Sequence, residues 1–190
     1  MVAAFLGFCK ARRIINTAIR NTRHFKMNRI VIDCDTGVDD ALALTVALRF
    51  PNVSVEGITC VAGNTGLGHV VRNTLSVVTC MNRQIPIYAG CHHTILRRKH
   101  TFQTMDSAEL THSANGFGGV THELEKEHWN LVQKEHGALA LCRMAKEQPG
   151  QLTLVALAPL TNIAMAMRLD PEFSSNLREI IIMGGNYKGI

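Results

Sequence analysis

Four aspartates stand within eight residues, directly after the apolar run Ile30–Ile32. They are Asp33, Asp35, Asp39 and Asp40. Like charges at this density need a compensating partner, because each negative charge disfavours the ionisation of its neighbours. Carboxylate oxygens are the ligands that calcium and magnesium prefer in proteins. The spacing therefore predicts a binding site for a hard divalent cation.

The segment that carries these aspartates is typical of a strand that leads into a helix. Asp35 lies just past the apolar run, and Asp39 and Asp40 open a stretch of helical periodicity that ends before Pro51. Ligands of open α/β folds bind at the carboxyl ends of the strands, so we expect Asp35 and Asp40 to converge there. Capping of the helix by Asp39 and Asp40 is the alternative, and it accounts for one or two carboxylates but not for four.

Two other acidic motifs can be compared with these residues by position. An EF-hand loop starting at Asp33 needs Asp or Asn at its fifth position and Gly at its sixth, where this chain has Gly37 and Val38, so the match fails. Phosphatases of the haloacid dehalogenase type also begin with a strand and Asp-x-Asp, followed by Thr or Val two residues later. That position holds Gly37 here, which leaves an aspartyl-phosphate phosphatase as a less favoured alternative.

The elements that must position these side chains alternate along the chain. Runs typical of buried strands are Arg29–Ile32, Val53–Val61, Ile85–Tyr88, Leu152–Leu157 and Glu179–Met183. Helical periodicity covers Asp39–Phe50, Gly68–Met81, Trp129–Lys146 and Leu160–Leu169. This order predicts a Rossmann-like α/β domain over residues 27–190, with a mainly parallel sheet and helices on both faces. The long polar stretch Cys91–Val120 breaks the pattern, as functional or mobile loops do.

Charge and composition limit the class of protein. The chain has 190 residues, a formal net charge of +5 and 46% hydrophobic residues, which suits one folded domain. Seven of its 20 basic residues precede the first acidic residue, Asp33, and the remaining 13 face 15 acidic residues, so the body of the chain has no general attraction for nucleic acid. No apolar stretch approaches the roughly 20 residues of a membrane span, so we expect no membrane partner.

The cellular compartment can be predicted from the cysteines and from the first residues. The six cysteines stand singly without a CxxC pair, which indicates reduced thiols and a cytoplasmic protein. Residues 1–26 contain basic residues and no acid, a composition typical of a mitochondrial transit peptide. A basic extension without targeting function, ahead of a start at Met27, is the alternative. We therefore expect a cytoplasmic location, with the mitochondrion as the alternative.

Several motifs together resemble the inosine-uridine preferring nucleoside hydrolase family. The strand and the aspartates of Ile30–Asp40 match its Asp-x-Asp-x-Gly-x-Asp-Asp signature. Further matches follow in the family's order at Thr59–Asn64, Ile87–Gly90, His112–Gly119, Leu157–Ala164 and Ile182–Gly185. Together they cover about Met27 to Gly189. The resemblance implies hydrolysis of the N-glycosidic bond of purine or pyrimidine ribonucleosides, which yields ribose and a free base.

The same resemblance implies a calcium ion at the floor of the site. Asp35 and Asp40 would bind the ion together with the backbone carbonyl of Leu157, where relatives often have Thr. A carbonyl ligand tolerates that change of side chain. Asp35 would also act catalytically by taking a proton from the attacking water.

The remaining roles implied by the resemblance concern the substrate. Asp39 and Asn64 would bind the ribose hydroxyls, and His112 would be a catalytic residue near the base. The loop of His112 departs from the family's His-Gly-x-Asp-Gly-Leu-Gly-Gly pattern at Ser113 and Asn115. Asp33 would order the loop without touching the substrate. Family members form dimers or tetramers, so the resemblance also implies a homo-oligomer.

The family's later motifs find no counterpart in this sequence. In the family, segments beyond Met-Gly-Gly supply further contacts to the ribose and the remaining metal carboxylate, whereas this chain ends at Ile190. We therefore expect an incomplete domain that turns over substrate poorly or not at all. A remnant that binds a nucleoside or a partner subunit without catalysis is the alternative function.

Overall fold

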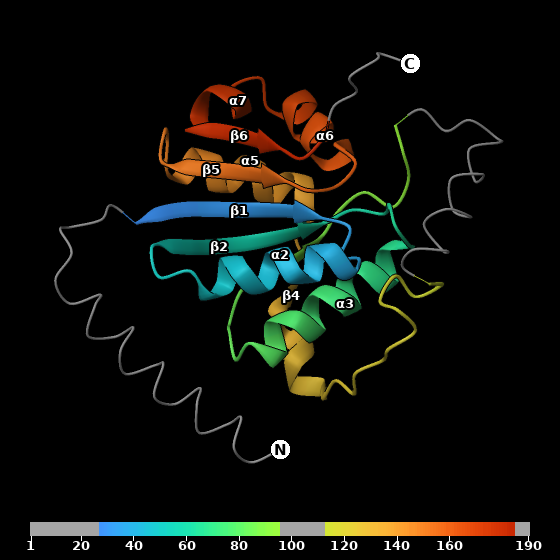
Figure 1. Ribbon diagram of the computed structural model, residues 1–190. Coiled ribbons are helices and arrows are strands. Elements are labelled where there is room, and N and C mark those ends of the chain that lie inside the picture. The colour runs from blue at the N-terminus through green and yellow to red at the C-terminus, as the bar shows by residue number, and fades with distance from the viewer. Residues whose placement is uncertain (1–26, 96–112, 185–190) are drawn as a thin grey trace, which may run out of the picture.

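Six strands form one parallel sheet in the order β4-β3-β2-β1-β5-β6 in a computed structural model that describes residues 27–95 and 113–184 (Figure 1). The strands are β1 (Asn28–Cys34), β2 (Val53–Cys60), β3 (Ile87–Ala89), β4 (Val132–Gln133), β5 (Leu152–Ala156) and β6 (Glu179–Ile182). The helices are α2 (Val38–Arg49), α3 (Leu67–Cys80), α5 (Gly137–Glu147), α6 (Thr161–Leu169) and α7 (Phe173–Asn176). The expected parallel α/β architecture is confirmed.

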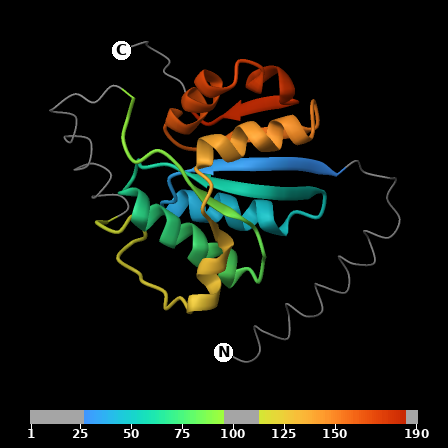
Figure 2. The ribbon, with the colours of Figure 1, turned by 180° about the vertical axis from the view of Figure 1, so that it is seen from behind.

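The helices form two layers, one on each face of the sheet. Helices α2 and α3 pack on β1, β2 and β3 through one buried apolar cluster. Helices α5, α6 and α7 pack on the other face through a second cluster that includes Leu141, Leu154 and Phe173, and α5 crosses that face in the view from behind (Figure 2). A sheet covered on both faces requires nearly continuous apolar strands, which explains the composition of β1 and β5.

The register of the central strands brings polar residues together at one end of the sheet. On β1, Asp33 is level with Thr59 of β2 and with Ala156 of β5. Because all neighbouring strands run parallel, every strand ends at the same edge. The loops that follow β1, β2 and β3 therefore meet above Asp33, where the sequence placed the site.

The expectation of one helix over Trp129–Lys146 is wrong. A 3-10 helix covers Lys126–Leu131, the short edge strand β4 follows, and α5 begins only at Gly137. The imidazole of His136 caps α5, since Nδ1 accepts a hydrogen bond of 3.2 Å from the amide of Ala138. Pairing of β4 with β3 outweighs the helical periodicity of this stretch.

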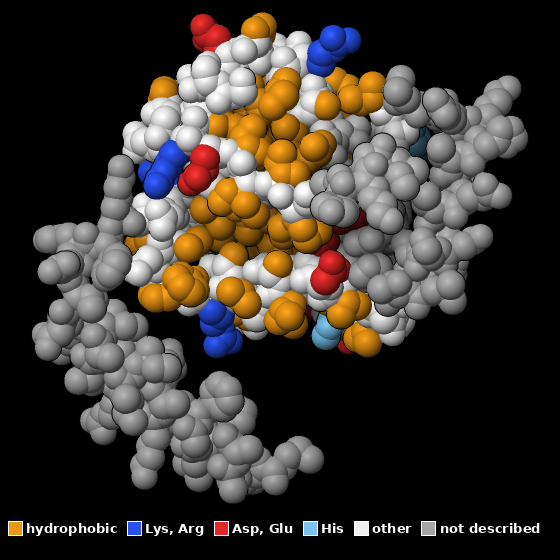
Figure 3. All heavy atoms as spheres, turned by 45° about the horizontal axis from the view of Figure 1, so that its top comes forward, with side chains coloured by type: hydrophobic (Ala, Val, Ile, Leu, Met, Phe, Trp, Pro, Cys, Tyr) orange, Lys and Arg blue, Asp and Glu red, His pale blue; other side chains and the backbone are white. Residues whose placement is uncertain are grey.

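Exposed hydrophobic side chains lie on the outer side of α2 and at the end of β6. Leu42 and Val46 on α2, Ile181 on β6 and Met183 beyond it are all at least half exposed. Figure 3 shows hydrophobic side chains gathered in the middle of the face that carries these elements. Among the residues that the structure describes, no helix on the α2 side packs over β5 and β6.

Two expectations concern parts of the chain outside or beside this fold. The basic segment 1–26, expected as a leader, lies outside the described residues. Within the described ranges, no helix has both the length and the apolar character needed to cross a membrane.

Candidate active site at the carboxyl ends of the strands

Asp35 and Asp40 form a pair of buried carboxylates at the carboxyl end of β1. Asp35 follows the strand directly, and Asp40 lies in the first turn of α2, with side chains 5% and 3% exposed. One oxygen of Asp40 accepts a hydrogen bond of 3.2 Å from the amide of Gly37, which holds it against the turn between strand and helix. The two carboxyl groups are close enough to influence each other's pKa. Both thus lie at the carboxyl end of β1, where the sequence placed them, and their roles as metal ligands stay predictions.

The burial and the mutual repulsion of these two carboxylates favour the binding of a cation between them. Burial raises the pKa of Asp35 and of Asp40, and the negative charge of Asp35 adds to the shift of Asp40. In the described part of the chain, no Lys, Arg or His forms an ion pair with either carboxylate. Two buried oxygen donors without a positive partner fit a hard divalent cation, which would remove the repulsion between them.

The loop after β2 packs directly against Asp35. The amide of Asn64 donates a hydrogen bond of 2.7 Å to Oδ2 of Asp35. At Gly63 the fit is so close that an added Cβ would lie 2.1 Å from the same oxygen. This contact places Asn64, a predicted ribose ligand, beside the carboxylate pair. The side chain of Asn64 is partly exposed, so a substrate can reach it.

The other predicted residues differ in their exposure to solvent and in their position relative to the carboxylate pair. Asp39 is exposed at the start of α2 and can meet a ligand from solvent. Leu157 directly follows β5, and its amide donates a hydrogen bond of 2.9 Å to the carbonyl of Asp33. This hydrogen bond holds Leu157 level with the end of β1. A backbone carbonyl that serves as a metal ligand there has to lie at this level. His112 lies outside the described residues, so its predicted role stays a prediction.

Asp33 is fully buried and takes part in a hydrogen-bond network below the carboxylate pair. Its Oδ1 accepts hydrogen bonds from the hydroxyl of Thr59 and, at 2.8 Å, from the amide group of Asn162. Burial raises the pKa of Asp33 to about 6, and these two hydrogen bonds partly offset the shift. A carboxylate without solvent access cannot attack a substrate, which counts against the phosphatase alternative. The expectation that Asp33 orders the loop agrees with this burial.

Sequence reasoning missed Asn162 and Thr59 as parts of the site. Thr59 carries little signal, because β2 contains two further polar residues, Ser54 and Glu56. Asn162 belongs to the Leu157–Ala164 motif, but nothing in its local sequence indicates that its partner lies 129 positions away. Only the fold brings these residues together.

The loop of residues 113–120 is fixed to both neighbouring loops of the site. The side-chain amide of Asn73 on α3 donates to the carbonyls of Thr36, at 3.1 Å, and Asn115, at 2.9 Å. The hydroxyl of Thr65 donates to the carbonyl of Ala114 at 3.1 Å. This loop carries the motif that departs from the family pattern. Its anchoring places the motif beside the segment that contains Asp35.

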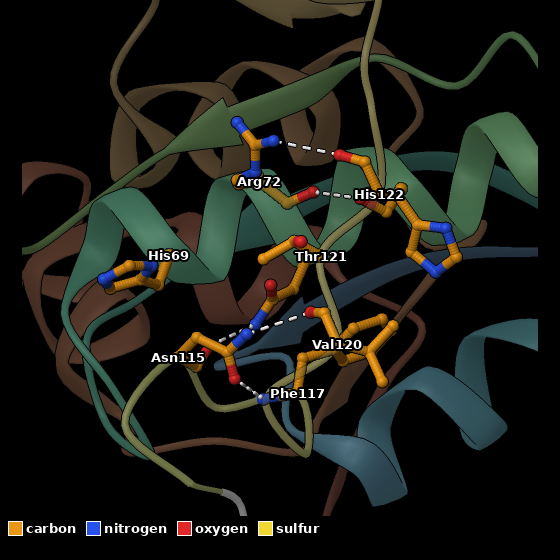
Figure 4. Close-up of a pocket in the computed structure, with 9 residues that line it drawn as sticks. His69, Arg72, Asn115, Phe117, Val120, Thr121 and His122 are labelled. Carbon is orange, nitrogen blue, oxygen red and sulfur yellow. Dashed lines mark hydrogen bonds between the residues drawn. The ribbon is translucent and has the colours of Figure 1, made fainter.

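A pocket of about 300 Å³ separates part of this loop from α3 (Figure 4). Arg72 on α3 closes one side by donating a hydrogen bond of 2.9 Å to the carbonyl of His122. The imidazoles of His69 and His122 lie on opposite sides of the pocket and do not converge. None of the predicted site residues lines this pocket. This pocket is therefore separate from the carboxylate pair.

The described residues supply only part of a metal centre. Within these ranges, no group of three or more His, Cys, Asp and Glu side chains is arranged to hold a metal ion. Two carboxylates and a backbone carbonyl remain as oxygen donors. Because the affinity for a hard cation rises with the number of charged ligands, this set alone would bind the ion weakly.

Comparison with known proteins matches this arrangement. The sequence model of the inosine-uridine preferring nucleoside hydrolase family matches residues 30–190. The probable uridine nucleosidase 2 of Arabidopsis thaliana is 38% identical over 160 residues, which are 84% of this chain and 48% of that protein. The pyrimidine-specific ribonucleoside hydrolase RihB of Escherichia coli is 34% identical over 160 residues, with the same coverage of 84% and 48%. The chain thus spans about half the length of these relatives.

Solved structures share the fold over the same part of the chain. An inosine-guanosine nucleoside hydrolase superposes with a TM-score of 0.76 at 30% identity, covering 85% of this chain and 50% of that chain. A purine-preferring ribonucleoside hydrolase from Gardnerella vaginalis also superposes with a TM-score of 0.76, at 29% identity, over 83% and 49% of the two chains. Sequence and fold agree, and the chain belongs to the inosine-uridine preferring nucleoside hydrolase family.

Proposed function

We propose that the protein hydrolyses the N-glycosidic bond of ribonucleosides and releases ribose and a free base, with calcium held by Asp35 and Asp40. The observation that carries this proposal is the buried carboxylate pair at the end of β1, to which the loop of Asn64 is hydrogen-bonded. Relatives are named for uridine, pyrimidine and purine nucleosides. Ribose and its glycosidic bond are common to all of these substrates, so the proposal rests on the ribose side of the site.

The exposure of each residue indicates its role, with exposed residues binding the ribose and a buried residue accepting the proton. Asp39 is exposed and Asn64 partly exposed, so both can form hydrogen bonds with the two hydroxyls of the ribose. Asp35 lies deeper and keeps one oxygen engaged by the amide of Asn64. Its other oxygen accepts a proton of the water that attacks the anomeric carbon, where positive charge develops as the base leaves. The base departs with the electrons of the C–N bond and takes up a proton from solvent, so that the free base and ribose are formed.

Asp40 and Leu157 complete the proposed metal site. Asp40 contributes its buried carboxylate, and Leu157 contributes a backbone carbonyl at the end of β5. When bound, a calcium ion would lower the pKa of a water molecule and so supply the nucleophile at neutral pH. Asp35 remains the group that receives the proton.

Binding of a nucleoside without turnover is the second candidate function. It is favoured by the donor set, because the described residues bring only two carboxylates to the metal site. Such a protein would still order a nucleoside between Asp39 and Asn64. Its melting temperature would rise with the ligand, since a ligand that binds only the folded state stabilises it.

Incubation of the purified chain with inosine and uridine distinguishes the two functions. We expect at most slow ribose release from this chain, which depends on calcium and stops when EDTA is added, measured as reducing sugar. A rise of the melting temperature with nucleoside but without ribose release would favour the binding function. Absence of both effects in the presence of calcium would contradict the proposal.

An Asp40→Asn substitution is expected to stabilise the metal-free protein while removing its response to calcium. The amide keeps the size of the side chain, can still accept from Gly37, and removes one of two buried like charges. We expect the melting temperature in EDTA to rise by about 2–4 °C, which corresponds to about 1 kcal/mol. Calcium should then no longer raise it. A lower melting temperature in EDTA would contradict the repulsion inferred from burial.

The same variant tests the pH dependence of the metal-free protein. Burial and the charge of Asp35 raise the pKa of Asp40 from its usual value near 3.8 to about 8. A raised pKa in the folded state means that stability is present at low pH and is lost as pH rises through the folded value. The stability advantage of the Asp40→Asn variant in EDTA should therefore grow between pH 5 and pH 8. Denaturant titrations of both proteins at the two pH values measure it.

A further inference from the structure

Asn162 connects the ends of the central strands through a single side chain. It lies in the first turn of α6 and is completely buried. Its amide nitrogen donates to Oδ1 of Asp33 at 2.8 Å and to the carbonyl of Cys60 at 3.0 Å. Its amide oxygen accepts from the backbone of Cys91 at 2.7 Å. One side chain thus joins the ends of β1 and β2 and the segment that follows β3.

Asp33 passes this connection on to the proposed metal site. Its carboxylate receives the hydrogen bonds of Asn162 and Thr59, and its carbonyl accepts from the amide of Leu157 at 2.9 Å. Asp35 follows two residues later. Because β1 is hydrogen-bonded along its length to β2 and β5, a shift of Asp33 would move both Asp35 and Leu157.

The backbone after β3 packs closely against the side chain of Asn162. A Cβ atom added to Gly90 would lie 2.2 Å from the amide oxygen of Asn162. Gly137, at the start of α5, packs in turn on Gly90, since a Cβ added there would be 3.2 Å from the Cα of Gly90. The absence of a side chain at Gly90 therefore allows the backbone to approach the amide group.

The hydrogen-bond network of Asn162 and Asp33 carries a desolvation penalty that an apolar core would not have. Oδ2 of Asp33 is buried and has no hydrogen-bond partner among the residues that the structure describes. An apolar pair of similar size would avoid that desolvation penalty. Hydrogen bonds, unlike apolar contacts, specify one arrangement of the strand ends, and this arrangement places the proposed ligands.

We propose that Asn162 is a positioning residue for the calcium site, acting through Asp33 on Asp35 and on the carbonyl of Leu157. The inference rests on the function proposed above. A positioning role and a purely structural role of Asn162 predict different effects of substitution. A structural residue would change the stability of the metal-free protein, whereas a positioning residue also changes the calcium affinity of the folded protein.

The test is an Asn162→Asp substitution in the full chain, followed by calcium titration. Aspartate has the same shape, but it replaces the donor to Asp33 and Cys60 with an acceptor. Loss of an outer partner of a metal ligand typically weakens metal binding, so we expect the dissociation constant for calcium to rise by about 10–100-fold. The melting temperature in EDTA, measured in parallel, shows that the titrated protein is folded.

Asp33→Asn is the matched control. Its amide oxygen can still accept from Asn162 and Thr59, and only the charge is removed. We expect its dissociation constant to stay within about fivefold of the unsubstituted chain, since the network remains intact. If Asp33→Asn weakens binding as much as Asn162→Asp, the charge of Asp33 matters and the positioning inference is wrong.

A second variant covers the case in which Asn162→Asp does not fold. Thr59→Val removes a single hydrogen bond to Asp33 while keeping the side-chain shape, and we expect a smaller loss of calcium affinity in the same direction. Calcium binding unchanged within twofold in every variant of Asn162 and Thr59 that folds would overturn the inference, provided that Asp35→Ala abolishes it. If Asp35→Ala also leaves calcium binding unchanged, the proposed metal site itself is wrong, and the inference fails with it.

Discussion

Replacement of Asp35 with alanine is expected to abolish calcium binding and, with it, any release of ribose. The substitution removes one of the two carboxylates that are assigned to the metal among the described residues. Since the number of charged oxygen ligands sets the affinity for calcium, we expect the dissociation constant to rise by more than about 100-fold. Calcium titration by calorimetry, together with the ribose assay, measures both effects.

The same substitution should also loosen the loop after β2. The amide of Asn64 loses its acceptor, which now holds it at 2.7 Å. Asn64 would then no longer be held at the end of β1, and nucleoside binding should weaken even where calcium is in excess. The rise of the melting temperature with inosine reports this loss independently of the metal.

Asp39→Asn is the appropriate control for Asp35→Ala. It changes a neighbouring carboxylate that is exposed and is assigned to the ribose, not to the metal. We expect this variant to keep calcium binding within about tenfold and to lose nucleoside binding. The reverse pattern, with calcium binding lost in Asp39→Asn and kept in Asp35→Ala, would exchange the two roles.

Local patterns in the sequence were sufficient for five of the six strands and for the position of the carboxylate pair. The apolar runs correspond to β1, β2, β3, β5 and β6, and the helical periodicities to α2, α3 and α6. Asp35 and Asp40 are five positions apart. Because a strand ends just before Asp35 and a helix begins just before Asp40, the two side chains lie at the same end of the sheet. Their convergence could be predicted because it depends on local geometry only.

The rest of the site depends on contacts between distant segments. Asn162 reaches Asp33 across 129 positions, and Asn73 reaches the loop of Asn115 across 42. No periodicity encodes such pairs, because they follow from the order of strands in the sheet. The two-residue strand β4 could not be predicted for a related reason. A strand this short is stabilised by its neighbour β3 and not by its own sequence.

Substitution of Gly63 with alanine is expected to disrupt the site without changing any proposed ligand. An added Cβ would lie 2.1 Å from Oδ2, 2.8 Å from Cγ and 3.0 Å from Cβ of Asp35. Atoms cannot remain at such distances, so either the carboxylate of Asp35 or the loop of Asn64 must move. Each movement breaks the hydrogen bond between them.

We expect Gly63→Ala to weaken calcium binding by at least about tenfold and to remove the stabilisation by inosine, because Asp35 serves both sites. Gly66→Ala is a matched control three residues along the same loop. A Cβ at Gly66 meets nothing within 4 Å, so this variant should bind calcium and inosine like the unsubstituted chain. Equal calcium affinities in the two variants would show that calcium binding does not depend on the contact between Gly63 and Asp35, and would contradict this prediction. A loss of calcium affinity in Gly63→Ala but not in Gly66→Ala would show that the affinity depends on the position of the Asp35 carboxylate.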